Sequence, residues 1–336
     1  RGTGRSRPLL DCPEVERATS AFLARVQSSR ADALDLEAAL RACHDRLLAE
    51  GQDLRAFTSA ASAQDVRDVM RALGYSSWNV YGVSYGSRLA LTVMRDAPDG
   101  VRSVVLDSTL PVGESLEASF GRNLERALRR LLADCAADER CAAAFPGLDA
   151  EVFDVVARLN ATPLVVTAPG PDGGAPVTTA ITGDRLLIGL RSALADVQLL
   201  PLVPLLVSRT ASGDTSLLAS AASGLAAGPI QAEGMHQSVV CAEDVPFLTP
   251  EVLARAADGV RPEIRAVADD FVVQQALDVC AFWGAGPARE IESSPVRSDL
   301  PTLILAGELD PITPPDWGRE AAQSLSRSEV VELPGL

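Results

Sequence analysis

A Gly-x-Ser-x-Gly pattern at residues 82–86 most constrains how this chain can fold. It follows an apolar run at residues 78–83 and precedes a helical stretch at residues 87–96. Between a strand and a helix, this pattern predicts a sharp turn that exposes the serine hydroxyl at the edge of a sheet. We expect Gly82 and Gly86 to be required, because a side chain at either position would clash as the helix packs back against the strand.

Three further apolar runs predict parallel strands, at residues 102–107, 301–306 and 329–333. Each is short and nearly continuous, which is typical of strands buried on both faces. Strands that alternate with helical stretches indicate a doubly wound, mostly parallel α/β sheet.

The chain changes character between residue 110 and about residue 294, where helical periodicity dominates. A hairpin with its turn at residues 171–174 is expected within this segment. A mostly helical insertion between two strands predicts a cap over their carboxyl edge. We therefore expect a core at residues 1–113 and 295–336, truncated at both ends and preceded by a signal peptide, and a cap domain at residues 114–294.

Composition excludes several classes of partner. The net charge of −15 argues against nucleic acid and anionic membranes, and no apolar run reaches the length of a membrane span. The sequence has no C-x-x-C pattern, no zinc-ligand spacing and no phosphate-binding loop, so we expect no metal and no cofactor. All 30 basic residues are arginine, which we interpret as the codon bias of a GC-rich bacterial genome.

Six cysteines are present, an even number that suits disulfides. Fifteen pairings are possible, and six free thiols in a cytosolic enzyme are the alternative. Disulfides would place the protein in a secreted or cell-envelope location. The pairs we expect join neighbours in the sequence: Cys12–Cys43, Cys135–Cys141 and Cys241–Cys280.

Ser84 is the candidate nucleophile, with an ordinary serine in a strand–helix turn as the alternative. The backbone N–H of Tyr85 would donate to an oxyanion. A hydroxyl nucleophile needs a base, which in folds with this turn follows the acid along the chain. His44 precedes Ser84 and His236 lies in the expected cap, so neither fits. We expect the catalytic histidine just after Leu336.

Asp310 is the candidate carboxylate that would orient this base. It follows the strand at residues 301–306, which ends at the same sheet edge as Ser84. Thr313 is placed to hydrogen-bond to Asp310. Glu308 is the competing carboxylate, but Asp310 lies further beyond the strand end.

Four stretches together resemble the α/β-hydrolase serine peptidases: "RGTGRS", "GVSYGSRLA", "SVVCAED" and "LAGELDPITPP". The chain is most similar to the secreted tripeptidyl-aminopeptidase-like branch, related to proline iminopeptidases, over essentially its whole length. The resemblance implies an α/β-hydrolase fold with Ser84 as the nucleophile, Asp310 as the acid and Thr313 in support. It also implies that Glu243, with Asp244, faces the active site and binds the free α-ammonium of a peptide.

These observations predict a serine aminopeptidase that releases amino-terminal residues or short peptides through an acyl-enzyme. Its partner would be a peptide with a free amino terminus. Two alternatives stay open. A carboxylesterase could use the same triad with Glu243 as a structural acid, and a non-catalytic hydrolase-like domain could bind peptides or a partner.

Overall fold

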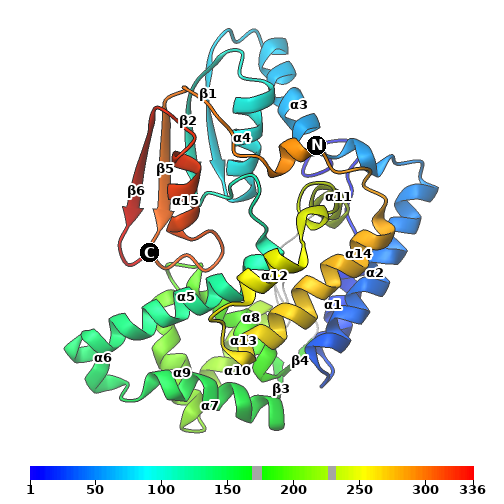
Figure 1. Ribbon diagram of the computed structural model, residues 1–336. Coiled ribbons are helices and arrows are strands. Elements are labelled where there is room, and N and C mark those ends of the chain that lie inside the picture. The colour runs from blue at the N-terminus through cyan, green and yellow to red at the C-terminus, as the bar shows by residue number, and fades with distance from the viewer. Residues whose placement is uncertain (169–175, 226–231) are drawn as a thin grey trace.

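A four-stranded parallel sheet lies at one side of the computed structural model, which describes residues 1–168, 176–225 and 232–336 (Figure 1, upper left). Its strand order is β1-β2-β5-β6, and each strand matches a predicted run to within one residue. The strands are β1 (Trp78–Val83), β2 (Val101–Asp107), β5 (Thr302–Gly307) and β6 (Ser328–Leu333).

Helices cover one face of this sheet. The helices α3 (Ser59–Ala72), α4 (Tyr85–Asp96) and α15 (Pro315–Ala322) contribute to a single apolar cluster with the inward side chains of the strands. The opposite face leaves Tyr81 62% exposed and Leu303 36% exposed. The expectation that these strands are buried on both faces is therefore wrong for the described residues, because successive side chains alternate between faces and only one face is covered.

The long segment between β2 and β5 is mostly helical, as predicted, and the strands point their carboxyl ends toward it (Figure 1). Its helices are α5 (Leu116–Ala137), α6 (Glu139–Ala144), α7 (Leu148–Ala161), α8 (Gly183–Leu194), α9 (Val203–Ala211), α10 (Ser216–Leu225), α11 (Glu233–Glu243), α12 (Pro250–Ala257), α13 (Pro262–Val267) and α14 (Gln274–Trp283). Short helical turns lie at Leu54–Ala56, Leu200–Leu202, Val245–Phe247 and Glu290–Ser293, with a π-helical turn at Ala268–Val273.

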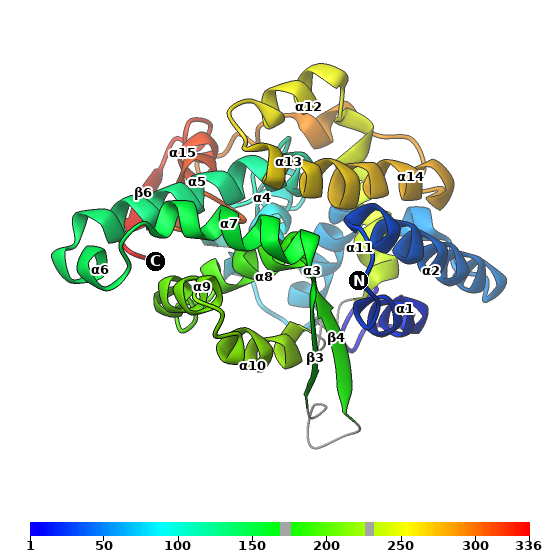
Figure 2. The same cartoon turned by 90° about the horizontal axis from the view of Figure 1, so that it is seen from below.

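The predicted hairpin has two antiparallel strands, β3 (Leu164–Ala168) and β4 (Val177–Ile181). They project from the helical insertion when it is seen from below (Figure 2). The expected turn at residues 171–174 lies outside the described residues.

The insertion has an apolar core of its own. On α5, Phe120, Leu124, Leu128 and Leu132 recur every four residues and are buried on one face of the helix. They pack with buried side chains of α7, α8, α9 and α13. Among the described residues, none of the helices combines the length and apolar character needed to cross a bilayer.

The first two helices, α1 (Pro13–Leu23) and α2 (Ser29–Ala49), pack against α11 and α14 of the insertion (Figure 1). Leu47 of α2 and Trp283 of α14 are completely buried in this cluster. The indole Nε1 of Trp283 donates a hydrogen bond of 3.0 Å to Ser238 Oγ. The amino-terminal helices thus extend the insertion, and the domain boundaries at residues 113 and 294 stay a prediction.

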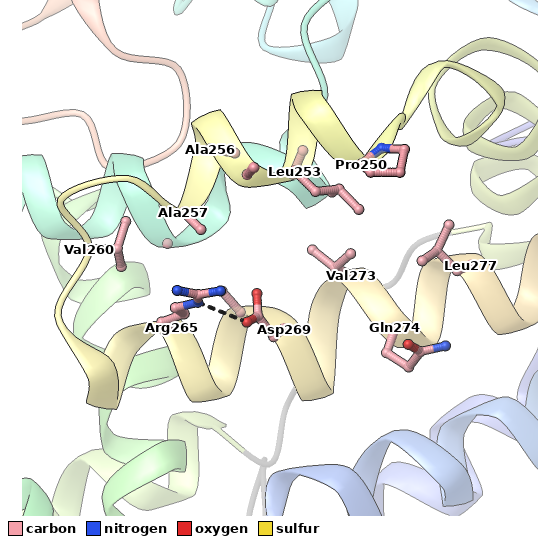
Figure 3. Close-up of a pocket in the computed structure, with 14 residues that line it drawn as sticks. Pro250, Leu253, Ala256, Ala257, Val260, Arg265, Asp269, Val273, Gln274 and Leu277 are labelled. Carbon is pink, nitrogen blue, oxygen red and sulfur yellow. Dashed lines mark hydrogen bonds and ion pairs between the residues drawn. The ribbon is translucent and has the colours of Figure 1, made fainter.

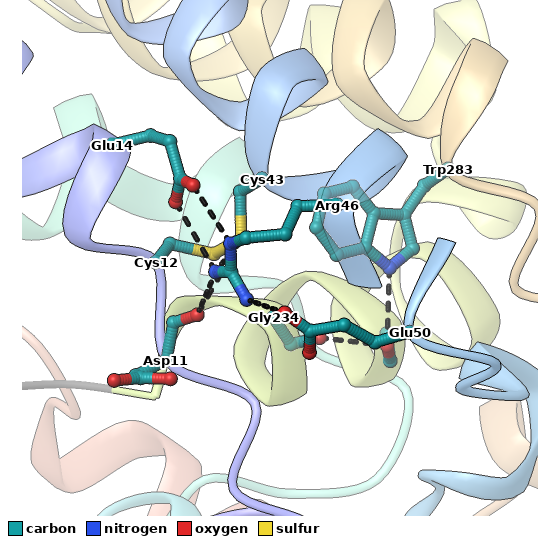
Figure 4. The surroundings of a disulfide bond; sticks show 9 residues. Asp11, Cys12, Glu14, Cys43, Arg46, Glu50, Gly234 and Trp283 are labelled. Carbon is teal, nitrogen blue, oxygen red and sulfur yellow. Dashed lines mark hydrogen bonds and ion pairs between the residues drawn. A yellow bond between two sulfur atoms is a disulfide. The ribbon is translucent and has the colours of Figure 1, made fainter. Parts of the chain in front are cut away.

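All three expected disulfides are present, so none of the six cysteines, all of which are described, is free. Cys12–Cys43 joins the start of α1 to α2, and the two remaining bonds join α5 to α6 and α11 to α14. Beside the first bond, Arg46 donates to Glu14 Oε1 at 2.8 Å and to the carbonyl of Asp11 at 2.7 Å (Figure 4).

Removing single disulfides should destabilise the protein according to the loop that each one closes. Cys241 and Cys280 are 39 residues apart in the sequence. Replacing both with serine releases the loop that their disulfide closes and should lower the free energy of unfolding by about 4 kcal/mol. The same replacement at Cys135 and Cys141, which are 6 residues apart, should cost about 2 kcal/mol. Denaturant unfolding measures both values, and a larger loss for the short loop would contradict the account.

Candidate active site

Ser84 occupies the tight turn between β1 and α4, where its backbone has φ 55° and ψ −123°. A positive φ is unfavourable for a residue with a side chain, so hydrogen bonds must hold this turn. The Ser84 N–H donates to the carbonyl of Asp107 on β2 at 2.9 Å. The Ser84 carbonyl accepts from the backbone N–H of Ser87 at 2.8 Å and from its hydroxyl at 2.5 Å. The predicted strained turn is therefore present, and the sheet and helix both secure it.

Only one of the two glycines in the motif is sterically required. A Cβ on Gly82 would lie 2.1 Å from the carbonyl oxygen of Gly86, whereas a Cβ on Gly86 would meet nothing within 4 Å beyond its own helix backbone. The expectation of a clash at Gly86 is wrong, because its carbonyl, and not its Cα, makes the close approach to the strand.

Asp310 lies in the loop between β5 and α15, and its carboxylate is held at both oxygens. Oδ1 accepts from the backbone N–H groups of Ile312 at 2.8 Å and Thr313 at 2.9 Å. Oδ2 accepts from Thr313 Oγ1 at 2.8 Å, which is the hydrogen bond expected from the sequence. The competing carboxylate, Glu308, forms an ion pair with Arg130 at 2.9 Å and accepts from Gly335 N at 3.1 Å.

Ser84 and Asp310 lie at the same edge of the sheet. They follow β1 and β5, which are parallel and separated only by β2. At the usual spacing of neighbouring strands, the ends of β1 and β5 are about 10 Å apart. The fold thus brings together the two residues that the sequence predicted as nucleophile and acid.

Helix α5 of the insertion holds the loop that carries Asp310. Arg126 donates to the carbonyls of Glu308 at 2.7 Å and Asp310 at 2.5 Å, and Asn123 donates to the carbonyl of Ile312 at 3.0 Å. These contacts could not be predicted from the sequence. Any residue type can supply a main-chain carbonyl, and these carbonyls lie more than 180 positions from the donors.

Glu243 ends α11 and is linked to the turn at Ser84. Its carboxyl group is buried, with only 4% of the residue exposed, and Oε1 accepts from the Ser59 N–H at 2.6 Å. The Ser59 hydroxyl in turn hydrogen-bonds to the Tyr85 hydroxyl at 2.9 Å. Burial raises the pKa of Glu243. A single residue, Ser59, therefore connects this buried carboxyl group to Tyr85, which follows Ser84.

Asp244 has a different environment, because it forms a buried ion pair with Arg88 of α4. Arg88 also donates to the carbonyls of Pro111, at 3.0 Å, and Glu114. Burial raises the pKa of Asp244 to about 7, against the effect of the arginine. Within the described residues, Asp244 has an arginine in an ion pair with it and Glu243 does not.

Both carboxylates line a pocket of about 140 Å³ between the start of α5 and α12. Arg122, Arg255 and Phe247 also line it. A second pocket, of about 370 Å³, lies on the other side of α12, and Arg265 and Asp269 pair within it at 3.1 Å (Figure 3). Since this ion pair satisfies both charges, the second pocket presents mainly apolar side chains.

Neither histidine is joined to the candidate residues. His44 Nδ1 lies 2.9 Å from Asp45 Oδ1, and its ring packs 5.4 Å from that of Trp283. His236 is half-buried on α11. In the described part of the chain, neither ring hydrogen-bonds to Ser84 or Asp310, and no group of three His, Cys, Asp or Glu side chains could hold a metal ion.

Two protein families match the chain in segments that contain these residues. Residues 1–143 match the family described as the alpha/beta hydrolase fold, and residues 265–335 match the family described as TAP-like protein. The chain therefore has the α/β-hydrolase fold. Ser84 and Asp310 lie in the first and second matched segments, respectively.

Curated relatives of this α/β hydrolase include the serine protease Hip1 of Mycobacterium tuberculosis and of Mycobacterium bovis. Each is 24% identical over 283 residues, covering 79% of this chain and 53% of the relative. The chain thus spans about half the length of these relatives.

Solved structures similar to this α/β hydrolase include an alpha/beta hydrolase from a deep-sea metagenome library, with 12% identity and a TM-score of 0.31. It covers 83% of this chain and 64% of that one. A proline iminopeptidase of Mycobacterium smegmatis has 16% identity and a TM-score of 0.31, covering 84% of this chain and 66% of that one.

The two glycines of the turn should respond differently to substitution. Gly82→Ala forces a Cβ onto the Gly86 carbonyl and should lower the free energy of unfolding by about 1–3 kcal/mol or more. Gly86→Ala, the matched control, places alanine in an open helical position and should leave stability unchanged or raise it by up to about 1 kcal/mol. Denaturant unfolding compares the two, and equal losses would contradict this geometry.

Proposed function

We propose that the full-length protein is a serine hydrolase that releases amino-terminal residues or short peptides from peptide substrates. One observation carries this proposal: Ser84, held at a positive φ, shares a sheet edge with Asp310, whose carboxylate is fixed by Thr313. A strained serine turn and an oriented carboxylate at one edge are the parts that a hydroxyl nucleophile requires. The match to the TAP-like family and the similarity to the Hip1 serine proteases also support it.

The mechanism assigns one task to each group. Ser84 Oγ attacks the substrate carbonyl while a histidine takes its proton, and the Tyr85 N–H donates to the developing oxyanion. Asp310 holds that histidine in the correct orientation. The histidine then protonates the leaving amine, and water releases the acyl group from Ser84.

We propose that this histidine follows Leu336 in the full-length protein. The carbonyl of Leu336 accepts from Leu309 N at 2.5 Å, and Gly335 N donates to Glu308 Oε2 at 3.1 Å. Residues after β6 are therefore beside the Asp310 loop. This position supports a base that reaches Asp310 on one side and Ser84 on the other.

Glu243 is the group proposed to bind the α-ammonium of the substrate. It lines the pocket of about 140 Å³, has no arginine in an ion pair with it, and connects through Ser59 to Tyr85. A carboxylate in a largely buried site favours a charged amino terminus over a blocked one. One observation supports the carboxylesterase alternative: Glu243 already accepts from the Ser59 backbone, as a structural acid would.

The three disulfides support a secreted or cell-envelope location, because such bonds persist in oxidising compartments. The proposed substrate is then an extracellular peptide.

A fluorophosphonate should modify the full-length protein once, at Ser84. Intact mass and peptide mapping measure the adduct. Ser84→Ala should abolish it, while Ser77→Ala, at an exposed serine before β1, should leave it unchanged. Asp310→Asn should lower kcat by about 10⁴-fold through loss of the oriented base. Labelling that persists in Ser84→Ala would contradict the assignment and leave a non-catalytic binding domain as the alternative.

Glu243→Gln should selectively impair substrates with a free amino terminus. Loss of one charge-assisted contact should reduce kcat/KM for such peptides by about 10- to 100-fold and leave a neutral ester unaffected.

Burial raises the pKa of Glu243, so its carboxylate is lost as pH falls through that raised value. As the pH is lowered, KM for peptides with a free amino terminus should therefore begin to rise at a higher pH than it would with an ordinary glutamate, whose pKa is about 4.3.

The control is Glu139→Gln, which removes the same charge from exposed helix α6. Equal losses on the peptide and the neutral ester would favour the carboxylesterase.

A further inference from the structure

Arg191 of α8 is a cation whose side chain forms no hydrogen bond with another described residue. Its guanidinium stacks over the ring of Phe120, with 4.8 Å from Cζ to the ring centroid. Its Nε is buried without a hydrogen-bond partner, and within the described residues the guanidinium forms no ion pair. An unpaired buried donor costs free energy, so such a group calls for an explanation.

Arg191 packs on the helix that holds the acid loop, because Phe120 lies on α5 three residues before Asn123, which donates to the carbonyl of Ile312. Burial lowers its pKa, while the negative charges of Asp310 and Glu117 raise it. Neither carboxylate bonds to it directly. Glu117 accepts from the Ser115 hydroxyl at 2.9 Å, and Asp310 is occupied by Ile312 and Thr313. Among the described residues, neither carboxylate therefore forms an ion pair with Arg191.

Other arginines at this edge of the sheet also have a buried Nε without a partner, but their terminal nitrogens are bonded. Arg88 is paired with Asp244, and Arg126 directs both of its terminal nitrogens to main-chain carbonyls of the Asp310 loop. Both arginines hold parts of the protein together. Arg191 is half-buried, so part of its side chain is exposed.

Arg191 and Glu243 are linked to different strand ends. Glu243 connects through Ser59 to Tyr85, after β1. Arg191 stacks on Phe120 of α5, the helix that holds the Asp310 loop after β5. β2 separates these two strand ends. A substrate that crosses Ser84 therefore meets a carboxylate on one side and a free guanidinium on the other.

We propose that Arg191 binds a carboxylate of the substrate, so that the site selects peptides with an anionic group across Ser84 from their amino terminus. This inference rests on the proposed function. A guanidinium stacked on an aromatic ring keeps its N–H edge free, and that edge matches a carboxylate with two parallel hydrogen bonds. The carboxylate is either the terminal one of a short peptide or that of an acidic side chain.

The test compares three matched peptides with the full-length protein. All have free amino termini. One ends in a carboxylate, one in a carboxamide, and one in a carboxamide after an internal glutamate. The wild type should prefer one or both anionic peptides over the neutral one by about 10- to 100-fold in kcat/KM. The preferred peptide shows which carboxylate Arg191 binds.

Arg191→Met should abolish this preference, and Arg191→Lys should retain part of it. Arg140→Met, which removes an exposed charge from α6, should keep the full preference. A preference that survives in Arg191→Met, or a loss that is equal for all peptides, would overturn the inference.

Calorimetry with Ser84→Ala separates this inference from the proposed function and does not depend on the folding of an Arg191 variant. The anionic peptide should bind about 10-fold or more tightly than the carboxamide. Equal affinities would overturn the role of Arg191 even if hydrolysis is confirmed. If the wild type cleaves none of the peptides, the proposed function fails, and the binding difference still tests Arg191.

Discussion

The parallel pairing of β2 with β5 is the contact on which the candidate site depends. Residues 104–107 align with residues 302–305, although the whole helical insertion separates them in the chain. The pairing extends beyond the strands, because Ser108 N donates to the carbonyl of Leu305 at 3.0 Å. Since parallel strands end at a common edge, this register fixes where Asp310 emerges relative to Ser84. A shift of one residue would turn the outward side chains of β5 into the core.

The same edge concentrates strain and the groups that compensate for it. The positive φ of Ser84 persists because its N–H bonds to β2 and its carbonyl bonds to Ser87. The Ser87 hydroxyl also accepts from Leu110 N at 2.8 Å, where the chain leaves the sheet toward α5. Helix α5 then returns to hold the Asp310 loop through Arg126. One continuous network therefore joins the Ser84 turn, the insertion and the acid loop.

Features that depend on neighbouring residues could be predicted from the sequence, whereas contacts between distant parts of the chain could not. The turn at Ser84, the four strands and the bond from Thr313 to Asp310 depend on residues within a few positions of each other. The pair of Arg88 with Asp244 joins residues 156 positions apart, and either one could have been a surface charge. The exposed sheet face at Tyr81 and the unpaired Arg191 could not be predicted from the sequence either. In the described chain, no helix covers Tyr81 and no hydrogen-bond partner contacts Arg191 Nε, and no sequence pattern indicates such an absence.

The central claim is that one base connects Asp310 to Ser84 across the end of β2. The most direct measurement is a crystal structure of the full-length protein, with the side-chain distances read at this edge. The account predicts a histidine from beyond Leu336 with one ring nitrogen within about 3 Å of Asp310 and the other within about 3 Å of Ser84 Oγ. A histidine bound to Glu308 instead, or a Ser84 hydroxyl with no base within reach, would contradict it.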